Sequence, residues 1–215
     1  MNAPKEIVLI GYSGHAFVVA DIFETMKRKV IGYCDSVEKN ENPYNLKYFG
    51  TENSEIGLKA LHHFDYFIAI GSNQIRRKIF EHLKSKVIAL PINAVHKNSI
   101  VAKNAKLQSG VMIAAGATIN PLAQIGNGVI CNTGCIIEHE NIIGDFAHIA
   151  PGTTLCGNVS IGENSFVGAN SVVRQGISIG SNVVIGAGSV VVKNIPDNCL
   201  ALGNPCRVIK FTVNK

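Results

Sequence analysis

The chain has 215 residues, a formal net charge of +5 and a pI near 8.9, which favours an anionic partner such as a nucleotide-bearing small molecule or a nucleic acid. Its Lys and Arg residues occur in short groups without interleaved aromatic residues, so nucleic-acid binding is disfavoured. No apolar run approaches the roughly 20 residues that span a bilayer. The sequence therefore predicts no transmembrane segment.

The cysteines and the first residues predict the compartment. The six cysteines contain no CxxC pair, so they give no sign of a paired-cysteine motif. The segment MNAPKEIVLI has neither the charged start nor the long apolar run of a signal peptide. We therefore expect reduced thiols and a cytoplasmic location.

Residues 5–90 predict alternating strands and helices. The segment EIVLIGYSGHA indicates an apolar strand, a Gly-containing turn and a helix through about Met26, the opening of a Rossmann-like nucleotide-binding α/β unit. The polar segment 36–55 predicts a loop with one short helix or hairpin. Further strands are expected at residues 29–35, 66–73 and 86–90. An amphipathic helix is expected at residues 74–85. Pro91 marks the predicted end of a first domain, residues 1–91.

From residue 95 onward the sequence follows a six-residue period. Seventeen positions, from Val95 to Val191, hold an aliphatic residue or, once, Cys131. A strict period of six fits neither an α-helix nor a plain hairpin, but it fits a chain that turns a corner every six residues. We expect these residues to point inward, with Cys131 as a small core residue. The second domain is predicted at residues 92–215, with a short C-terminal tail.

The segment GYSGH, residues 11–15, predicts an anion site in the first domain. A turn between strand and helix presents backbone N–H groups and a helix N-terminus to a phosphate, although many such turns are only tight connections. The spacing G-x-x-G is not the dinucleotide fingerprint, so NAD binding is not supported. Asp35, about 20 residues on, is placed to accept a hydrogen bond from a sugar hydroxyl. Gly71 follows another strand, and the three loops together predict a nucleotide site.

The segment IIEHE predicts a second site in the repeat. His139 and His148 fall at the third and sixth positions of their hexads, where we expect corners that face outward. Glu140 can orient the His139 imidazole and raise its basicity, and the alternative is an exposed charge pair without function. A zinc site like that of γ-type carbonic anhydrases needs three histidines, and the repeat adds only the distant His96, so no metal is predicted.

Five segments together closely resemble bacterial sugar acyltransferases of the PglD and NeuD type, from about residue 5 to residue 210. The resemblance implies an N-terminal α/β nucleotide-sugar-binding domain and a C-terminal left-handed parallel β-helix with about 18 residues per coil, which binds acetyl-CoA. It also implies a homotrimer, which would bury the exposed apolar faces of a short prism. The segments are GYSGH, YFIAIGSNQIRRKI, NTGCIIEHENIIGDFAHIAPG, GNVSIGENSFVGANSVV and GNPCRVIK.

The same resemblance implies roles for individual residues. His139 would be the general base, and Glu140 would increase its basicity. His148 would contact the acetyl group of acetyl-CoA, and the backbone around Ala169 and Ala187 would hold the pantetheine arm. The residues implied in nucleotide-sugar binding are Ser13, Gly14, His15, Asp35, Ser36 and Gly71.

The implied activity is direct N-acetylation of a nucleotide-linked amino sugar in glycan biosynthesis, with acetyl-CoA as co-substrate and a UDP-linked 4-amino-4,6-dideoxy hexose as the expected acceptor. Two alternatives stay open: O-acetylation, as in sialic-acid-type relatives, and a non-catalytic nucleotide-sugar-binding trimer. Ala169 and Ala187 are one 18-residue coil apart and stack along one edge, whereas His139 falls on a different face. We therefore expect His139 and the acetyl-CoA edge of each site to come from neighbouring subunits.

Overall fold

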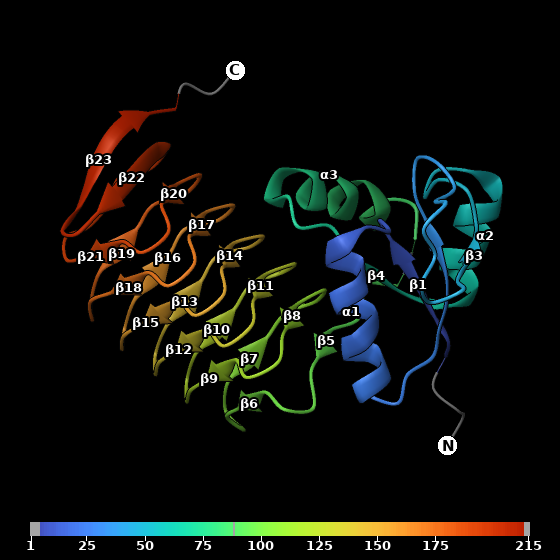
Figure 1. The fold of residues 1–215 in the computed structure, drawn as a ribbon, viewed down its shortest axis with the longest axis horizontal. Helices are drawn as coiled ribbons and strands as arrows, with labels where there is room; N and C mark the ends of the chain where they lie inside the picture. The colour runs from blue at the N-terminus through green and yellow to red at the C-terminus, as the bar shows by residue number, and fades with distance from the viewer. Residues whose placement is uncertain (1–4, 88, 213–215) are drawn as a thin grey trace. The chain divides into compact units, whose positions relative to one another are not determined.

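The computed structural model describes residues 5–87 and 89–212, and the chain divides into two compact units, residues 1–97 and 98–215. The first unit is an α/β domain and the second is a left-handed parallel β-helix (Figure 1), which confirms the predicted fold class. No helix within the described ranges is long and apolar enough to cross a membrane.

The core of the first unit is a parallel sheet with the strand order β3-β2-β1-β4. The central strand β1 (Ile7–Ile10) is buried throughout and pairs in parallel with β2 (Val30–Cys34) and β4 (Asp65–Ile68). Strand β3 (Lys47–Tyr48) extends the sheet beyond β2. A strand covered on both faces reads as a continuous apolar run, which is why the sequence IVLI was sufficient to predict β1.

The helices of the first unit are α1 (Gly14–Thr25), α2 (Glu55–His63) and α3 (Asn73–Lys84). Helices α1 and α3 lie where the sequence predicts them. For residues 36–55 the sequence predicts a loop with one short helix or hairpin, but helix α2 begins only at the end of that segment, so it was not predicted at its observed position. Its start is stabilised locally, because the Ser54 hydroxyl accepts a hydrogen bond from Gly57 N at 3.1 Å, which is an N-cap contact.

The prediction of a strand at residues 86–90 is wrong, because residues 86, 87, 89 and 90 form no strand. Ile88 lies outside the described residues. The sheet is extended instead by β3, inside the segment predicted as a loop or hairpin. Val87 is only 2 % exposed. Within this run Val87 is buried without pairing in a sheet, whereas Ala89 and Leu90 are exposed, so the apolar residues did not indicate a strand.

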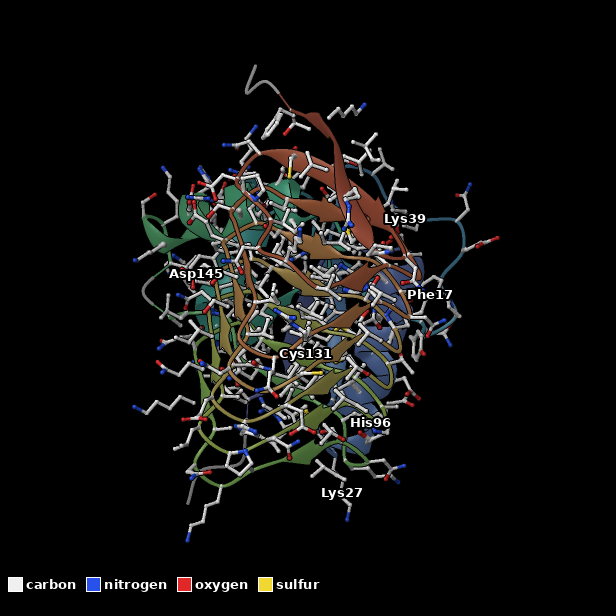
Figure 2. All side chains as sticks on the ribbon, turned by 90° about the vertical axis from the view of Figure 1, so that its left-hand side faces the viewer. Phe17, Lys27, Lys39, His96, Cys131 and Asp145 are labelled. Atoms are coloured by element: carbon white, nitrogen blue, oxygen red, sulfur yellow. The ribbon has the colours of Figure 1, made fainter. Side chains whose placement is uncertain are left out.

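In the second unit each coil contributes short strands to three sheets, which we call the first, second and third face. Partners in neighbouring coils are 18 residues apart, as in Ile130 with His148 and His148 with Phe166, which confirms the coil length. The second residue of each two-residue strand is a position of the six-residue period. From Ile113 to Val191 these residues are at most 2 % exposed, and Cys131 among them is fully buried (Figure 2).

Strand β5 (Ala94–Val95) comes first in the chain and lies next to β8 in the sheet order. The later strands of each face follow one another coil by coil. The first face contains β8 (Met112–Ile113), β11 (Ile130–Cys131), β14 (His148–Ile149), β17 (Phe166–Val167), β20 (Val184–Ile185) and β22 (Cys199–Gly203), with the antiparallel β23 (Cys206–Phe211) beside β22. The second face contains β6 (Ile100–Val101), β9 (Thr118–Ile119), β12 (Ile136–Ile137), β15 (Thr154–Leu155), β18 (Val172–Val173) and β21 (Val190–Val191). The third face contains β7 (Lys106–Leu107), β10 (Gln124–Ile125), β13 (Ile142–Ile143), β16 (Ser160–Ile161) and β19 (Ser178–Ile179).

Two-residue turns separate the faces and form three corners along the prism. Corner A lies between the first and second faces and includes residues 133–134, 151–152, 169–170 and 187–188. Corner B lies between the second and third faces and includes residues 121–122, 139–140, 157–158 and 175–176. Corner C lies between the third and first faces and includes residues 127–128, 145–146, 163–164 and 181–182.

Candidate functional site

His139 and Glu140 form an exposed hydrogen-bonded pair at corner B, directly after strand β12. The distance from His139 Nδ1 to Glu140 Oε2 is 3.0 Å, and the two side chains are 58 % and 56 % exposed. Because a carboxylate can only accept, Nδ1–H is the donor and Nε2 keeps its lone pair. The pair therefore presents an oriented imidazole with a basic nitrogen available to a ligand.

Gly157 occupies the same corner one coil further along, and the His139 ring lies against it. A Cβ atom on Gly157 would stand 2.5 Å from His139 Cε1 and 2.6 Å from Nε2. The glycine is required for space, since its φ is not in the left-handed region. No motif in the sequence marks Gly157, although the 18-residue coil places it one coil beyond position 139.

Glu140 adopts the left-handed backbone conformation, with a φ of 63°. For a residue with a side chain this conformation costs roughly 1–2 kcal/mol, and such strain concentrates at functional sites. At corner B the strained backbone turns the carboxylate toward the neighbouring imidazole. The conformation is consistent with a residue kept for its hydrogen bond to His139.

His148 does not lie at an outward corner, contrary to the expectation from its hexad position. It is the first residue of strand β14 on the first face and is only 8 % exposed. Asn132 Nδ2 donates to its Nε2 at 3.1 Å, and the ring meets Phe166 edge-on at a centroid distance of 5.0 Å. The six-residue phase gives the direction of a side chain but not what covers it. No cluster of three or more His, Cys, Asp or Glu side chains that could hold a metal occurs in the described part of the chain.

Ala169 and Ala187 lie at corner A, at the opposite edge of the second face from His139. The turn with Ala169 precedes strand β18, whereas the turn with His139 follows strand β12 of the same sheet. Ala169 and Ala187 stack in successive coils, where Gly188 N donates to Ala169 O at 2.8 Å. Within one chain the candidate base and the expected acetyl-CoA edge are therefore separated by the width of a sheet.

In the first unit, the three loops predicted to share one sheet edge do meet. Tyr12 N, in the loop after β1, donates to Asp35 Oδ2 after β2 at 2.9 Å. His15 lies close to Gly71 after β4, since a Cβ there would be 3.8 Å from its Cγ. Ser13 is the N-cap of α1, but its hydroxyl makes no capping hydrogen bond and is exposed. The loops thus surround backbone and hydroxyl donors suited to a phosphate.

The Asp35 carboxylate mainly holds these loops in place. It accepts hydrogen bonds from Tyr12 N and from both Ser36 N and Ser36 Oγ, and it pairs with Lys39 Nζ at 3.0 Å. Burial alone would raise the pKa of Asp35, but the hydrogen bonds from Tyr12, Lys39 and Ser36 outweigh it and lower the pKa below its usual value. The acid is therefore ionised and largely engaged before any sugar hydroxyl arrives.

Arg76 belongs to one of the short basic groups of the sequence, yet it is only 1 % exposed. Its guanidinium donates to Ile70 O and Gly71 O, each at 3.0 Å, and to Asn73 Oδ1 at 2.9 Å, so it fixes the third loop. Burial and the charge of Arg76 lower the pKa of His15 to about 4, so this imidazole is neutral at pH 7. His15 Nε2 is buried and has no hydrogen-bond partner within residues 5–87 and 89–212.

A Rossmann-like unit whose loops gather backbone and hydroxyl donors, joined to a β-helix that carries an imidazole–carboxylate pair at a corner, defines a two-domain acyltransferase architecture. Residues 6–83 match the PglD N-terminal domain, and residues 158–193 match the hexapeptide repeat of succinyl-transferase. The chain belongs to the family of bacterial acetyl-CoA-dependent sugar N-acetyltransferases that combine these two parts.

Solved structures of relatives cover nearly the whole chain. A variant of perosamine N-acetyltransferase from Caulobacter crescentus, in complex with CoA and GDP-perosamine, is 31 % identical, with a TM-score of 0.89 over 97 % of this chain and 98 % of that chain. The acetyltransferase domain of PglB from Neisseria gonorrhoeae FA1090, in complex with acetyl coenzyme A, is also 31 % identical, with a TM-score of 0.89 over 96 % of this chain and 100 % of that domain.

A curated relative matches over a shorter stretch. GDP-perosamine N-acetyltransferase of Escherichia coli O157:H7 is 33 % identical over 103 residues, which are 47 % of this chain. The chain spans about half the length of this relative, 46 %. These likenesses establish the family and the co-substrate class, and the acceptor of this chain is a separate question.

Proposed function

We propose that the protein transfers an acetyl group directly from acetyl-CoA to the amine of a nucleotide-linked amino sugar, with His139 as the general base. The observation that carries this proposal is the geometry of corner B, where Glu140 accepts from His139 Nδ1 and leaves Nε2 with its lone pair on an exposed side chain. An imidazole in this tautomer can remove a proton from an incoming nucleophile. Glu140 orients the ring and stabilises the imidazolium that forms.

The amine attacks in its neutral form, after its ammonium proton is lost to solvent, because an ammonium group cannot attack a thioester. Its nitrogen must then lose one further proton to become an amide, and this step needs a proton acceptor. His139 Nε2 takes a proton as the amine nitrogen forms a bond to the acetyl carbonyl carbon. When the tetrahedral intermediate collapses, the C–S bond breaks, and the imidazolium returns the proton to the leaving CoA thiolate. Backbone N–H groups or His148 would stabilise the oxyanion. The thioester is already activated, so no covalent enzyme intermediate is required.

A homotrimer would complete this site. The first, outward residue of each strand of the second face carries no charge. Ile100, Ile136 and Val172 among them are 65 %, 37 % and 41 % exposed, an apolar stripe that favours association. A closed ring of three copies that meet through this face sets corner B of each copy beside corner A of the next. His139 of one subunit would then face Ala169 and Ala187 of its neighbour.

The acceptor is proposed to be a 4-amino-4,6-dideoxy hexose linked to a nucleoside diphosphate, bound through the loops of Ser13, Gly14 and His15 and of Asp35, Ser36 and Gly71. The sequence resemblance implies UDP as the nucleotide. GDP is the competing choice, because relatives of this chain bind or act on GDP-perosamine.

An acetyl-CoA consumption assay with UDP-, GDP- and dTDP-linked amino sugars, and with free sialic acid, tests the proposal. We expect turnover with one nucleotide-linked amino sugar and a product acetylated on nitrogen by mass spectrometry. Turnover with sialic acid alone would instead show O-acetylation. If acetyl-CoA failed to raise the thermal midpoint, as a ligand of the native state must, and no acceptor reacted, the protein would be a non-catalytic scaffold.

A further inference from the structure

Leu122 on corner B adopts the left-handed backbone conformation, which is unusual for a leucine. The second residue of each turn from 110 to 188, all within the described coils, has a positive φ. These fourteen residues are seven glycines, four asparagines and three others. Glycine and asparagine are the residues that tolerate this conformation, so the three others need a separate reason. They are Leu122, Glu140 and Phe146.

Two of the three exceptions are explained by their contacts. Phe146 is 4 % exposed, and its ring fills the space beside Gly128, where a Cβ would lie 2.7 Å from Phe146 Cδ1. Glu140 holds the His139 imidazole. Leu122 has a φ of 67° and is 54 % exposed, so little apolar burial offsets its strain of roughly 1–2 kcal/mol.

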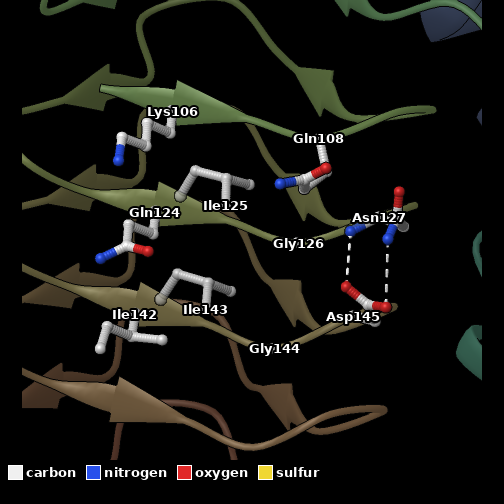
Figure 3. Close-up of a pocket in the computed structure, with 10 residues that line it drawn as sticks. All are labelled: Lys106, Gln108, Gln124, Ile125, Gly126, Asn127, Ile142, Ile143, Gly144 and Asp145. Atoms are coloured by element: carbon white, nitrogen blue, oxygen red, sulfur yellow. Dashed lines mark hydrogen bonds between the residues drawn. The ribbon is translucent and has the colours of Figure 1, made fainter. Parts of the chain in front are cut away.

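Leu122 stands one coil before Glu140 on corner B, and both border the same hollow. The hollow has a volume of about 330 Å³ and is lined by Asn104, Lys106, Leu122, Gln124 and Glu140. Lys106 and Gln124 are outward residues of the third face and point the same way (Figure 3), where they also border a second hollow of about 490 Å³. The two hollows share Lys106 and Gln124, and the smaller one reaches the carboxylate that orients His139.

We infer that the hollow beside Glu140 is the subsite for the acceptor sugar ring and that Leu122 is its apolar, specificity-determining wall. Successive strands are about 4.8 Å apart, so a sugar ring seated on Leu122 would span the one coil that separates this residue from the His139–Glu140 turn. A hexose presents carbon-bound hydrogens on its face, which suit a leucine, and hydroxyls on its rim, which suit the amides of Asn104 and Gln124.

The charge of the hollow fits the same ligand. Lys106 supplies a cation for the phosphate carried at the anomeric carbon of a nucleotide-linked sugar. Glu140 lines the hollow and accepts a hydrogen bond from His139 Nδ1. Because His139 is the proposed base, the reacting amine belongs at the end of the hollow that Glu140 forms. This assignment rests on the proposed function, since it names where on this chain the acceptor of that reaction is held.

Two substitutions at Leu122 separate a ligand contact from a structural role. Leu122→Asn suits the left-handed backbone but removes the apolar wall, so we expect the KM for the nucleotide-linked sugar to rise about tenfold. The KM for acetyl-CoA and the thermal midpoint should not worsen, and relief of strain can raise the midpoint. Leu122→Met keeps an apolar side chain, and its KM for the sugar should stay near that of the wild type.

The outcomes distinguish this inference from the function on which it rests. Turnover by the wild type with an unchanged sugar KM in Leu122→Asn would overturn the inference alone. A wild type that acetylates no amino sugar would overturn the proposed function and the subsite together. If Leu122→Asn does not fold, Leu122→Gly, which fits the same backbone conformation, provides the same test with the same expected rise in KM.

Discussion

The imidazole of His139 lies against the backbone of Gly157, which occupies the same corner one coil later, and a Cβ at that glycine would come within 2.5 Å of the ring. Glu140 holds Nδ1 from the other side at 3.0 Å. The ring is therefore confined between a carboxylate that fixes its tautomer and a glycine that leaves room for it.

Replacement of Gly157 by alanine should displace the candidate base. The backbone at 157 tolerates a side chain, because its φ is outside the left-handed region, so the new methyl group must push the imidazole away. We expect kcat to fall about tenfold to a hundredfold, since small misplacements of a reacting group have effects of that size. Circular dichroism should show an unchanged fold. In a His139→Ala background the same change should cost nothing more, and an additional loss there would show that Gly157 acts otherwise.

Removal of the imidazole itself tests the role of His139. General-base catalysis contributes typically 10² to 10⁴ in rate, so His139→Ala should lower kcat by about that factor. The side chain is exposed, so the oligomeric state and the thermal midpoint should be unaffected. Near-normal turnover in steady-state assays would refute the assignment of the base.

Glu140 should show opposite effects on activity and on stability. Glu140→Asn places a residue that tolerates the left-handed conformation at a φ of 63°, so the free energy of unfolding should rise by up to about 1 kcal/mol. The same change shortens the side chain that holds His139 Nδ1, and kcat should fall. Chemical denaturation and steady-state kinetics on one preparation check both effects. A variant that is less stable than the wild type would argue against strain at this corner.

The sequence was most informative where a structural feature depends on counting residues along the chain. The inward row of the β-helix was predicted because its period is six, and the His139–Glu140 pair was predicted because the two residues are adjacent. Gly157 could have been found by adding one coil to position 139, but only its missing side chain, seen against the ring, shows why it matters.

Other features depend on packing that leaves little sign in the sequence. His148 has the phase of an outward residue, yet it is buried beside Phe166 and Asn132. Arg76 is one of three consecutive basic residues. Nothing in the sequence indicates that Arg76, rather than its neighbours, donates to the carbonyl groups of Ile70 and Gly71. Burial of a polar side chain is set by the elements around it, which local patterns do not specify.

Two isoleucines in one coil offer a matched test of the proposed trimer. Ile136 begins strand β12 on the second face and is 37 % exposed, whereas Ile142 begins strand β13 on the third face and is 50 % exposed. Ile136→Asp would place a charge in an apolar subunit interface, so light scattering should report monomers. Ile142→Asp should remain trimeric. Dissociation by the second variant and not the first would place the interface on the third face.

The stability of the first unit should depend on pH through His15. Burial, and then the charge of Arg76, lower the pKa of this imidazole from 6.5 to about 4. Between these values the unfolded chain binds a proton that the folded chain does not, so stability is lost as pH falls from 6.5 toward 4. The loss attributable to His15 approaches about 2 kcal/mol at pH 5. Urea denaturation of the wild type and of His15→Gln at pH 7 and pH 5 measures it.

Comparison of His15→Gln with the wild type at the same two pH values isolates the contribution of His15 to the pH dependence. His15→Gln should flatten the dependence because a glutamine has no proton to gain in this range. A His15 ring resonance that titrates near pH 6.5 in NMR spectra would contradict the argument. A midpoint near 4 would mean that the imidazole meets a nucleotide-sugar as a neutral group, whose buried Nε2 can hydrogen-bond the ligand without adding charge beside Arg76.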